Sequence, residues 1–122
     1  MKRILVVDDS AAIRKAIRRI IEPLGFTVDE AGDGQQALTY CAEWGSVDAI
    51  LLDIDMPVMD GLTFLRQLRG LAGMPQPTVI MCTSHNTMNN IEEALALGAN
   101  EYIMKPFDTD IISSKFQQLE LM

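Results

Sequence analysis

The sequence predicts an α/β domain, a doubly wound five-stranded parallel sheet with five helices. Four short, almost purely apolar runs suit strands that are buried on both faces. Between them lie segments whose apolar residues recur with the period of a helix. Strands and helices that alternate in this way build parallel sheets. A length of 122 residues fits one domain, and we expect residues 1–122 to form it without a second domain.

Local signals mark the ends of the elements. Ser10 and Asp108 can cap the first and last helices, and Pro23 with Gly25 ends the first. Residues 26–31 alternate apolar with polar side chains, which is typical of a half-exposed edge strand. The predicted strands cover 4–7, 26–31, 50–53, 78–82 and 101–104, and the predicted helices run from Ser10 to Gly25, from 35 to 44, from near Asp60 to Leu68, from Asn86 or Thr87 to Gly98, and from Asp108 to Leu119.

Apolar spacing also indicates which side chains face the core. Cys41 and Cys82 lie among apolar neighbours, so we expect two small core residues in a reducing compartment rather than metal ligands. The inward residues expected on the third and fourth helices are Leu62, Leu65, Leu68, Ile91, Ala94 and Leu95.

Charge and hydropathy exclude several classes of partner. A net charge of −7 argues against nucleic acid, which requires a concentrated basic surface. No apolar run approaches the about 18 residues of a membrane span, and Lys2 and Arg3 precede too short an apolar run for a secretory signal. We therefore expect a cytoplasmic protein with no membrane partner.

The basic residues are concentrated near the N-terminus, where residues 1–25 hold six of the ten. Four of them, Arg14, Lys15, Arg18 and Arg19, lie on the first predicted helix. Such a stripe is either the solvated side of an amphipathic helix or a docking face for an acidic or phosphate-bearing partner protein.

Polar residues that can handle a phosphoryl group follow the four apolar runs. Asp8 and Asp9 follow the first run, and Asp53, Thr83 and Lys105 follow the others. Open parallel sheets bind ligands beyond the carboxyl ends of their strands, so we expect these side chains to meet at one edge.

This set of side chains suits magnesium-dependent phosphoryl transfer. Clustered carboxylates favour a hard divalent cation such as Mg²⁺, which bridges them to phosphate oxygens. One carboxylate can act as a nucleophile and form an acyl phosphate. An ammonium and a hydroxyl, here from Lys105 and Thr83, can offset charge on the phosphoryl group in flight.

The whole chain resembles the receiver domain of bacterial response regulators, and in particular the single-domain CheY-like type. The resemblance lies in ILVVDDS at 4–10, LDIDMPVMDG at 52–61 and GANEYIMKPF at 98–107. It implies a flavodoxin-like sheet in the order 2-1-3-4-5 and a protein that signals rather than an enzyme, with self-catalysed phosphoryl transfer and autodephosphorylation. It also implies a place in a two-component system, in chemotaxis-like signalling or another phosphorelay.

The resemblance assigns a role to each site residue. It implies that Asp53 accepts the phosphoryl group, with Thr83 and Lys105 in contact with the phosphate. It further implies that Tyr102 is an aromatic switch residue coupled to Thr83, and that the peptide between Lys105 and Pro106 is cis. The implied Mg²⁺ ligands are Asp8, Asp9, Asp53 and the backbone carbonyl of Asp55.

The resemblance also suggests partners and kinetics. The phosphoryl group is expected from a histidine kinase or a histidine phosphotransfer protein, and the receiver is expected to be a monomer or weak dimer. Asp55 and His85 are expected to set the lifetime of the acyl phosphate, because the family fold places both where water approaches the phosphorus. No effector domain is expected, so output should come from a target protein bound to the face of the fourth helix, fifth strand and fifth helix; the candidates there are Met88, Asn89, Asn90, Tyr102, Ser113, Ser114 and Gln117.

Two other interpretations share parts of the pattern. Residues 50–55 also resemble the nucleophile strand of haloacid-dehalogenase-like phosphatases and phosphotransferases, with Thr83 and Lys105 as later motifs. Against this, the acidic pair precedes the nucleophile and the chain has no cap domain. A pseudo-receiver would keep the fold as a phosphorylation-independent interaction or nucleotide-binding module, but the set of acidic, hydroxyl and lysine residues is complete.

Overall fold

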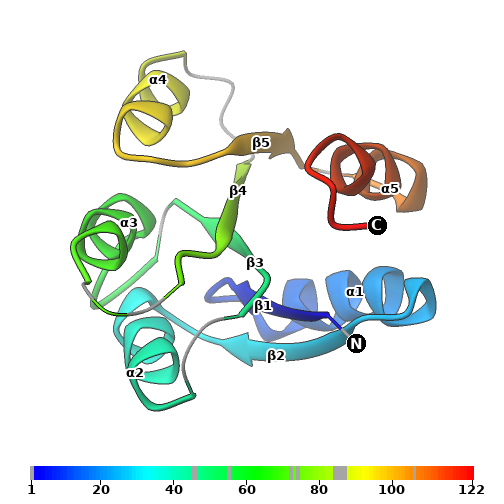
Figure 1. The fold of residues 1–122 in the computed structure, drawn as a ribbon, viewed down its shortest axis with the longest axis horizontal. Helices are drawn as coiled ribbons and strands as arrows, with labels where there is room; N and C mark the ends of the chain where they lie inside the picture. Colours follow the sequence, from blue (N-terminus) through cyan, green and yellow to red (C-terminus); the bar gives the residue numbers. More distant parts are fainter. Residues whose placement is uncertain are drawn as a thin grey trace.

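The computed structural model describes residues 2–44, 47–54, 56–71, 73, 75–83, 88–105 and 107–122. Within them, parallel strands form one sheet in the order β2-β1-β3-β4-β5 (Figure 1), which confirms the predicted fold class and strand order. The strands are β1 (Arg3–Val7), β2 (Thr27–Ala31), β3 (Ala49–Asp53), β4 (Thr78–Thr83) and β5 (Glu101–Met104).

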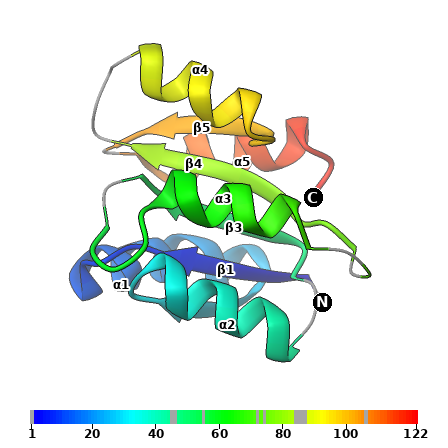
Figure 2. The same ribbon diagram turned by 90° about the vertical axis from the view of Figure 1, so that its left-hand side faces the viewer.

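Helices cover both faces of this sheet. Figures 1 and 2 show α1 and α5 on one face and α2, α3 and α4 on the other. Each layer encloses its own apolar core, one around Phe116 and the other around Phe64. None of the helices in the described residues is long and apolar enough to span a membrane. The helices are α1 (Ala11–Ile21), α2 (Gly34–Trp44), α3 (Gly61–Arg69), α4 (Met88–Ala96) and α5 (Thr109–Gln118), with a 3-10 turn η1 (Glu22–Leu24).

The burial of each strand follows from its place in the sheet. β1, β3 and β4 have helices on both faces, so their apolar residues are almost completely buried. β2 lies at an edge and is half-exposed, as predicted, but its buried residues do not alternate regularly: Val28 and Ala31 enter the cores on opposite faces of the sheet. Cys41 and Cys82 are buried free thiols. Burial raises the pKa of the Cys82 thiol to about 12, which fits the predicted role of an unreactive core residue.

Side-chain caps start four of the helices. Ser10, Asp33, Asp60 and Asp108 each accept a hydrogen bond from the backbone N–H three residues further on. These caps satisfy N–H groups that lack a partner in the first helical turn. The predicted starts of α1 and α5 at Ser10 and Asp108 are therefore confirmed.

One predicted core position is wrong. On α4 the core contact comes from Ile91 and Ala94, whereas Leu95 keeps 44% of its surface exposed. The apolar stripe of α4 is narrower than its run of apolar residues, so the residue one position off the centre of the stripe turns toward solvent. On α3 the buried face is centred on Phe64 and Leu65, and Leu62 packs against the core at its margin, as its predicted inward position requires.

Candidate functional site

The predicted polar residues meet at the carboxyl edge of the sheet. Asp53 and Thr83 are the last residues of β3 and β4, while Asp8 and Lys105 directly follow β1 and β5. Asp8 and Thr83 are buried, with 2% and 1% of their surfaces exposed. The register pairs Asp53 with Cys82, so Thr83 stands one residue beyond the Asp53 level on the neighbouring strand.

Three carboxylates form the centre of the site. One oxygen from each of Asp8, Asp9 and Asp53 lies within 4.8 Å of the other two. Asp8 is buried, Asp53 is half-buried and Asp9 is exposed to solvent. Three negative charges this close repel one another, so the arrangement favours a divalent cation with oxygen ligands.

Lys105 supplies the positive charge of the site. Its Nζ lies 2.6 Å from Oδ2 of Asp8 and 3.7 Å from Oδ1 of Asp53. Its backbone N–H donates to the carbonyl of Thr83 at 2.8 Å, which ties the end of β5 to the end of β4. Lys105, which directly follows β5, therefore contacts the ends of the other three strands that carry the site.

The two central groups have shifted pKa values. Burial raises the pKa of the Asp53 carboxyl; Lys105 opposes this shift and the charge of Asp8 adds to it. Burial alone would lower the pKa of Lys105, but its hydrogen bond to Asp8 and the charge of Asp53 outweigh burial and raise it. The protonated form of Lys105 is thus stabilised, and it lies beside a carboxylate whose ionised form is destabilised by burial.

Close backbone packing fixes the position of Asp53. A Cβ atom at Gly61 would collide with the backbone oxygen of Asp53, so a glycine is required where α3 begins. The N–H of Gly61 donates to the carbonyl of Ile54 at 2.8 Å. The N–H of Gly34, at the start of α2, donates to the carbonyl of Met59 at 3.0 Å. The loop after β3 is therefore held against two helices.

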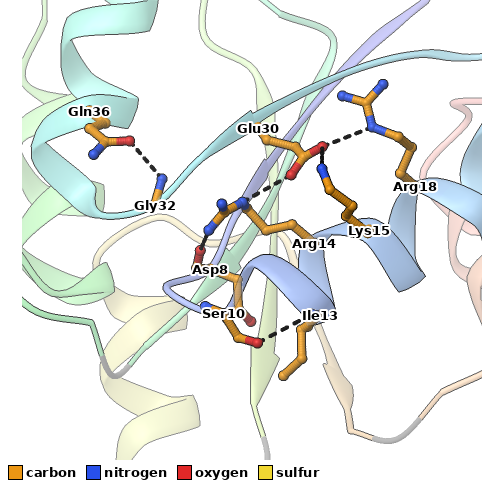
Figure 3. Close-up of polar contacts among 9 residues, drawn as sticks. All are labelled: Asp8, Ser10, Ile13, Arg14, Lys15, Arg18, Glu30, Gly32 and Gln36. Atoms are coloured by element: carbon orange, nitrogen blue, oxygen red, sulfur yellow. Dashed lines mark hydrogen bonds and ion pairs between the residues drawn. The ribbon is translucent and has the colours of Figure 1, made fainter.

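The turn after β1 is organised by Asp8 and by the first helix. Oδ1 of Asp8 accepts from the backbone N–H of Ser10 at 2.9 Å. The carbonyl of Asp8 accepts from Nη1 of Arg14 at 2.6 Å, and Nε of Arg14 donates to Glu30 at 3.0 Å (Figure 3). The sequence did not indicate Arg14 or Glu30 as part of the site. One sequence signal could have indicated them. The helix after β1 leads directly into the edge strand β2, so side chains on that helix are expected to lie near β2.

The basic stripe of α1 is only partly a solvated face. Arg14, Lys15 and Arg18 all pair with the carboxylate of Glu30, at 3.0, 3.6 and 2.9 Å. Arg14 and Arg18 are half-buried, so for them the interpretation as simple solvated charges is wrong. Lys15 and Arg19 are exposed, and a role in docking stays a prediction.

The predicted switch residue is held by its neighbours. Tyr102 is partly buried and packs against the core on the side of α2, α3 and α4. Nζ of Lys115, on α5, lies 5.7 Å from the centre of the Tyr102 ring, a cation–π distance. Lys115 also pairs with Glu101 at 3.4 Å.

Several predictions fall outside the described residues. Asp55, predicted as a metal ligand and lifetime residue, is not among the described residues, and neither are His85 and Pro106. The predicted cis peptide before Pro106 therefore stays a prediction. The same holds for the predicted caps at Asn86 and Thr87. The side chains of Met88, Asn89 and Asn90 on the candidate docking face are also outside it.

Comparison with known proteins is consistent with this geometry. Residues 4–117 match the family described as response regulator receiver domain. SphR, the alkaline phosphatase synthesis transcriptional regulatory protein of Synechococcus elongatus, is 40% identical over 115 residues, covering 88% of this chain and 44% of SphR. This chain spans about half the length of SphR and similar curated relatives.

Solved structures with the same fold cover nearly the whole chain. The chemotaxis protein CheY4 of Vibrio cholerae is 30% identical with a TM-score of 0.88, covering 97% of this chain and 98% of CheY4. The response regulator TrrA of Thermotoga maritima, solved in complex with Mg²⁺ and BeF, is 32% identical with a TM-score of 0.84, covering 98% of this chain and 99% of TrrA.

Proposed function

We propose, because this chain belongs to the family of response regulator receiver domains, that Asp53 accepts a phosphoryl group from a histidine kinase or a histidine phosphotransfer protein. Receiver domains are signalling proteins and are not classed as enzymes. The observation that carries the proposal is the cluster of Asp8, Asp9 and Asp53, whose oxygens lie within 4.8 Å, with Nζ of Lys105 at 3.7 Å from Asp53. Transfer to Asp53 and later loss of the phosphoryl group would be catalysed by the receiver itself.

Transfer to Asp53 is a nucleophilic displacement at phosphorus. A carboxylate oxygen of Asp53 forms the new P–O bond, while the bond from phosphorus to the donor breaks and its electron pair stays with the donor. Lys105, protonated and 3.7 Å from Asp53, would offset the charge of the phosphoryl oxygens. The hydroxyl of Thr83, at the end of the adjacent strand, would donate a hydrogen bond to one of them.

The donor set fits Mg²⁺. Hard divalent cations take oxygen ligands, and Asp8, Asp9 and Asp53 present three carboxylates around one point. These residues would hold the ion, with the backbone carbonyl of Asp55 as the further ligand implied by the family pattern. When bound, Mg²⁺ supplies positive charge that neutralises carboxylates and phosphoryl oxygens together. TrrA, solved with Mg²⁺ and BeF, supports this assignment.

Output would run through a target protein bound to the face of α4, β5 and α5. The half-buried ring of Tyr102, on β5, lies 5.7 Å from Nζ of Lys115 on α5, so movement of that ring would change this surface. Thr83 ends the strand next to β5, and Lys105 bonds to its carbonyl, which links the phosphoryl site to β5. Thr83→Ala should take up phosphate but lose the response of the target, and normal target binding by that variant would refute the coupling.

Asp55 and His85 would tune the lifetime of the acyl phosphate, on the family pattern. Replacing either residue should change the rate of dephosphorylation severalfold without a large effect on folding, which is the scale expected of a group that positions water. After removal of the phosphodonor, unchanged decay in both Asp55→Ala and His85→Ala would refute this role.

Incubation with acetyl phosphate tests the proposed function. The protein should take up one phosphoryl group with Mg²⁺ and none when the metal is chelated. Asp53→Asn, which keeps the shape of the side chain, should take up none. Repeated turnover of a simple phosphate ester would instead favour a haloacid-dehalogenase-like phosphatase, and failure of the wild-type protein to take up phosphate from any donor would favour a pseudo-receiver.

A further inference from the structure

A second polar cluster lies beside the acidic site, where α1 passes over the end of β2 (Figure 3). Nε of Arg14 donates to Oε1 of Glu30 at 3.0 Å, and Nη1 donates to the carbonyl oxygen of Asp8 at 2.6 Å. The side chains of Arg14 and Glu30 are only 18% and 15% exposed. One guanidinium thus joins α1, the edge strand and the first residue of the acidic turn.

The carbonyl that Arg14 contacts is where the chain leaves the sheet. Val7 is the last residue of β1 in register with both neighbouring strands. The N–H of Asp8 still donates to the carbonyl of Ala31 at 3.1 Å, but the Asp8 carbonyl lies beyond these pairs. A backbone carbonyl in a buried position requires a donor, and Arg14 provides one. The same peptide unit contains the N–H of Asp9, so its orientation directs the Asp9 side chain.

We propose that Arg14 is a positioning residue for the divalent-cation site. Held by Glu30, it fixes the peptide between Asp8 and Asp9 so that the Asp9 carboxylate faces Asp8 and Asp53. A planar guanidinium suits this role because its donors have fixed directions and can bridge two acceptors. The inference rests on the proposed function, because it takes Asp8, Asp9 and Asp53 as the Mg²⁺ ligands.

The charge of Arg14 and its positioning contacts predict opposite effects of its removal on Mg²⁺ affinity. A cation beside three carboxylates repels Mg²⁺, so loss of its charge would tighten metal binding. Loss of a positioning contact would weaken it, since residues that orient metal ligands typically contribute about 10-fold to 100-fold in affinity. The direction of the change therefore separates the two explanations.

Arg18 offers a matched control on the same helix. Its Nε donates to Oε2 of the same Glu30 carboxylate at 2.9 Å, and its Nη1 donates to Oε2 of Glu22, the residue directly after α1, at 3.2 Å. Arg18→Ala therefore removes the same charge and one bond to Glu30, but leaves the contact of Arg14 with Asp8 in place.

Calorimetric titration with Mg²⁺ at constant ionic strength tests the inference. Arg14→Ala should bind Mg²⁺ about 10-fold more weakly than the wild-type protein. Arg14→Lys should fall between them, because an ammonium keeps the charge but not the two fixed donor directions. Arg18→Ala should bind as the wild-type protein does, or slightly more tightly. In the metal-free protein, NMR relaxation should show a more mobile Asp9 amide in Arg14→Ala and an unchanged one in Arg18→Ala.

The outcomes distinguish this inference from the function on which it rests. Arg14→Ala with wild-type or tighter Mg²⁺ affinity would overturn the positioning role, and so would equal weakening in Arg18→Ala. If Arg14→Ala does not fold, Arg14→Lys decides: weaker binding supports the role and unchanged binding overturns it. Failure of the wild-type protein to bind Mg²⁺ would overturn the proposed metal site, and the positioning role with it.

Discussion

Replacing Asp53 by Asn is expected to stabilise the metal-free protein while it abolishes phosphoryl acceptance. Burial raises the pKa of the Asp53 carboxyl, which means that the fold disfavours its charge. A raised carboxyl pKa also fixes the sign of the pH dependence. The folded pKa of Asp53 lies above the ordinary aspartate value of about 3.9. As pH falls from 7 through this folded pKa, the wild-type protein should gain stability relative to Asp53→Asn.

The magnitude follows from the distances around Asp53. At an effective dielectric constant near 20, two charges at the upper limit of 4.8 Å repel by about 3.5 kcal/mol, and the attraction of Lys105 at 3.7 Å is about 4.5 kcal/mol. Two repulsions, from Asp8 and Asp9, thus exceed one attraction by about 2.5 kcal/mol. Solvent around the exposed Asp9 reduces the net effect to about 1 kcal/mol, or about 4 °C in Tm.

Denaturant unfolding with a chelator at low salt measures this effect. Asp53→Asn should be more stable than the wild-type protein, and the difference should shrink as salt is added. Glu93→Gln, which removes a charge from an exposed position on α4, should stay within about 0.5 kcal/mol of wild type. Mg²⁺ at ten times its Kd should stabilise the wild-type protein by about 1.4 kcal/mol and the variant by less. A metal-free variant less stable than the wild-type protein would refute the reasoning.

Three further predictions concern neighbouring groups. Burial alone would raise the pKa of the Glu30 carboxyl, but hydrogen bonds from two arginines of α1 lower it. Its contribution to stability is therefore present above about pH 4.3 and lost as pH falls through the folded pKa. Glu30→Gln should cost about 1 kcal/mol at pH 7, and in acid unfolding this cost should disappear once the pH is below the folded pKa. Val58, 82% exposed, has a φ of 67° that a β-branched residue rarely adopts, so Val58→Asn should raise the free energy of unfolding by about 1 kcal/mol, and a lower Tm would contradict this. Both carboxylate oxygens of Asp8 already accept hydrogen bonds, whereas the side chain of Asp9 is exposed and available to the metal. Calorimetry should therefore show that Asp9→Ala loses more Mg²⁺ affinity than Asp8→Ala. Equal losses would contradict this order.

The convergence of the site was predictable because it follows from topology. Parallel strands bring their carboxyl ends to one edge, so Asp8, Asp53, Thr83 and Lys105 meet there although 97 positions separate the first from the last. Buried strands and helical spacing are strong signals in a single sequence, and they were sufficient to place all four residues. The roles of these residues came from the resemblance to a family.

Other features depend on side-chain geometry that spacing does not determine. The contact of Arg14 with Glu30 and with the Asp8 carbonyl depends on how α1 lies over β2, and a stripe of basic residues predicts a solvated face equally well. Periodicity likewise could not decide that Ala94 would enter the core while the adjacent Leu95 stays exposed. A rotation of a helix by part of a turn changes such contacts and leaves the hydrophobic pattern unchanged.

The central claim, that Asp53 is the phosphoacceptor of a Mg²⁺-dependent receiver, is tested most directly by locating the phosphoryl group. The protein is treated with acetyl phosphate and Mg²⁺, the acyl phosphate is reduced with borohydride, and the converted residue is identified by mass spectrometry. Conversion is expected at Asp53 alone, and none is expected when Mg²⁺ is chelated. Conversion at Asp8 or Asp9 instead, or at Asp53 to the same extent without metal, would contradict it.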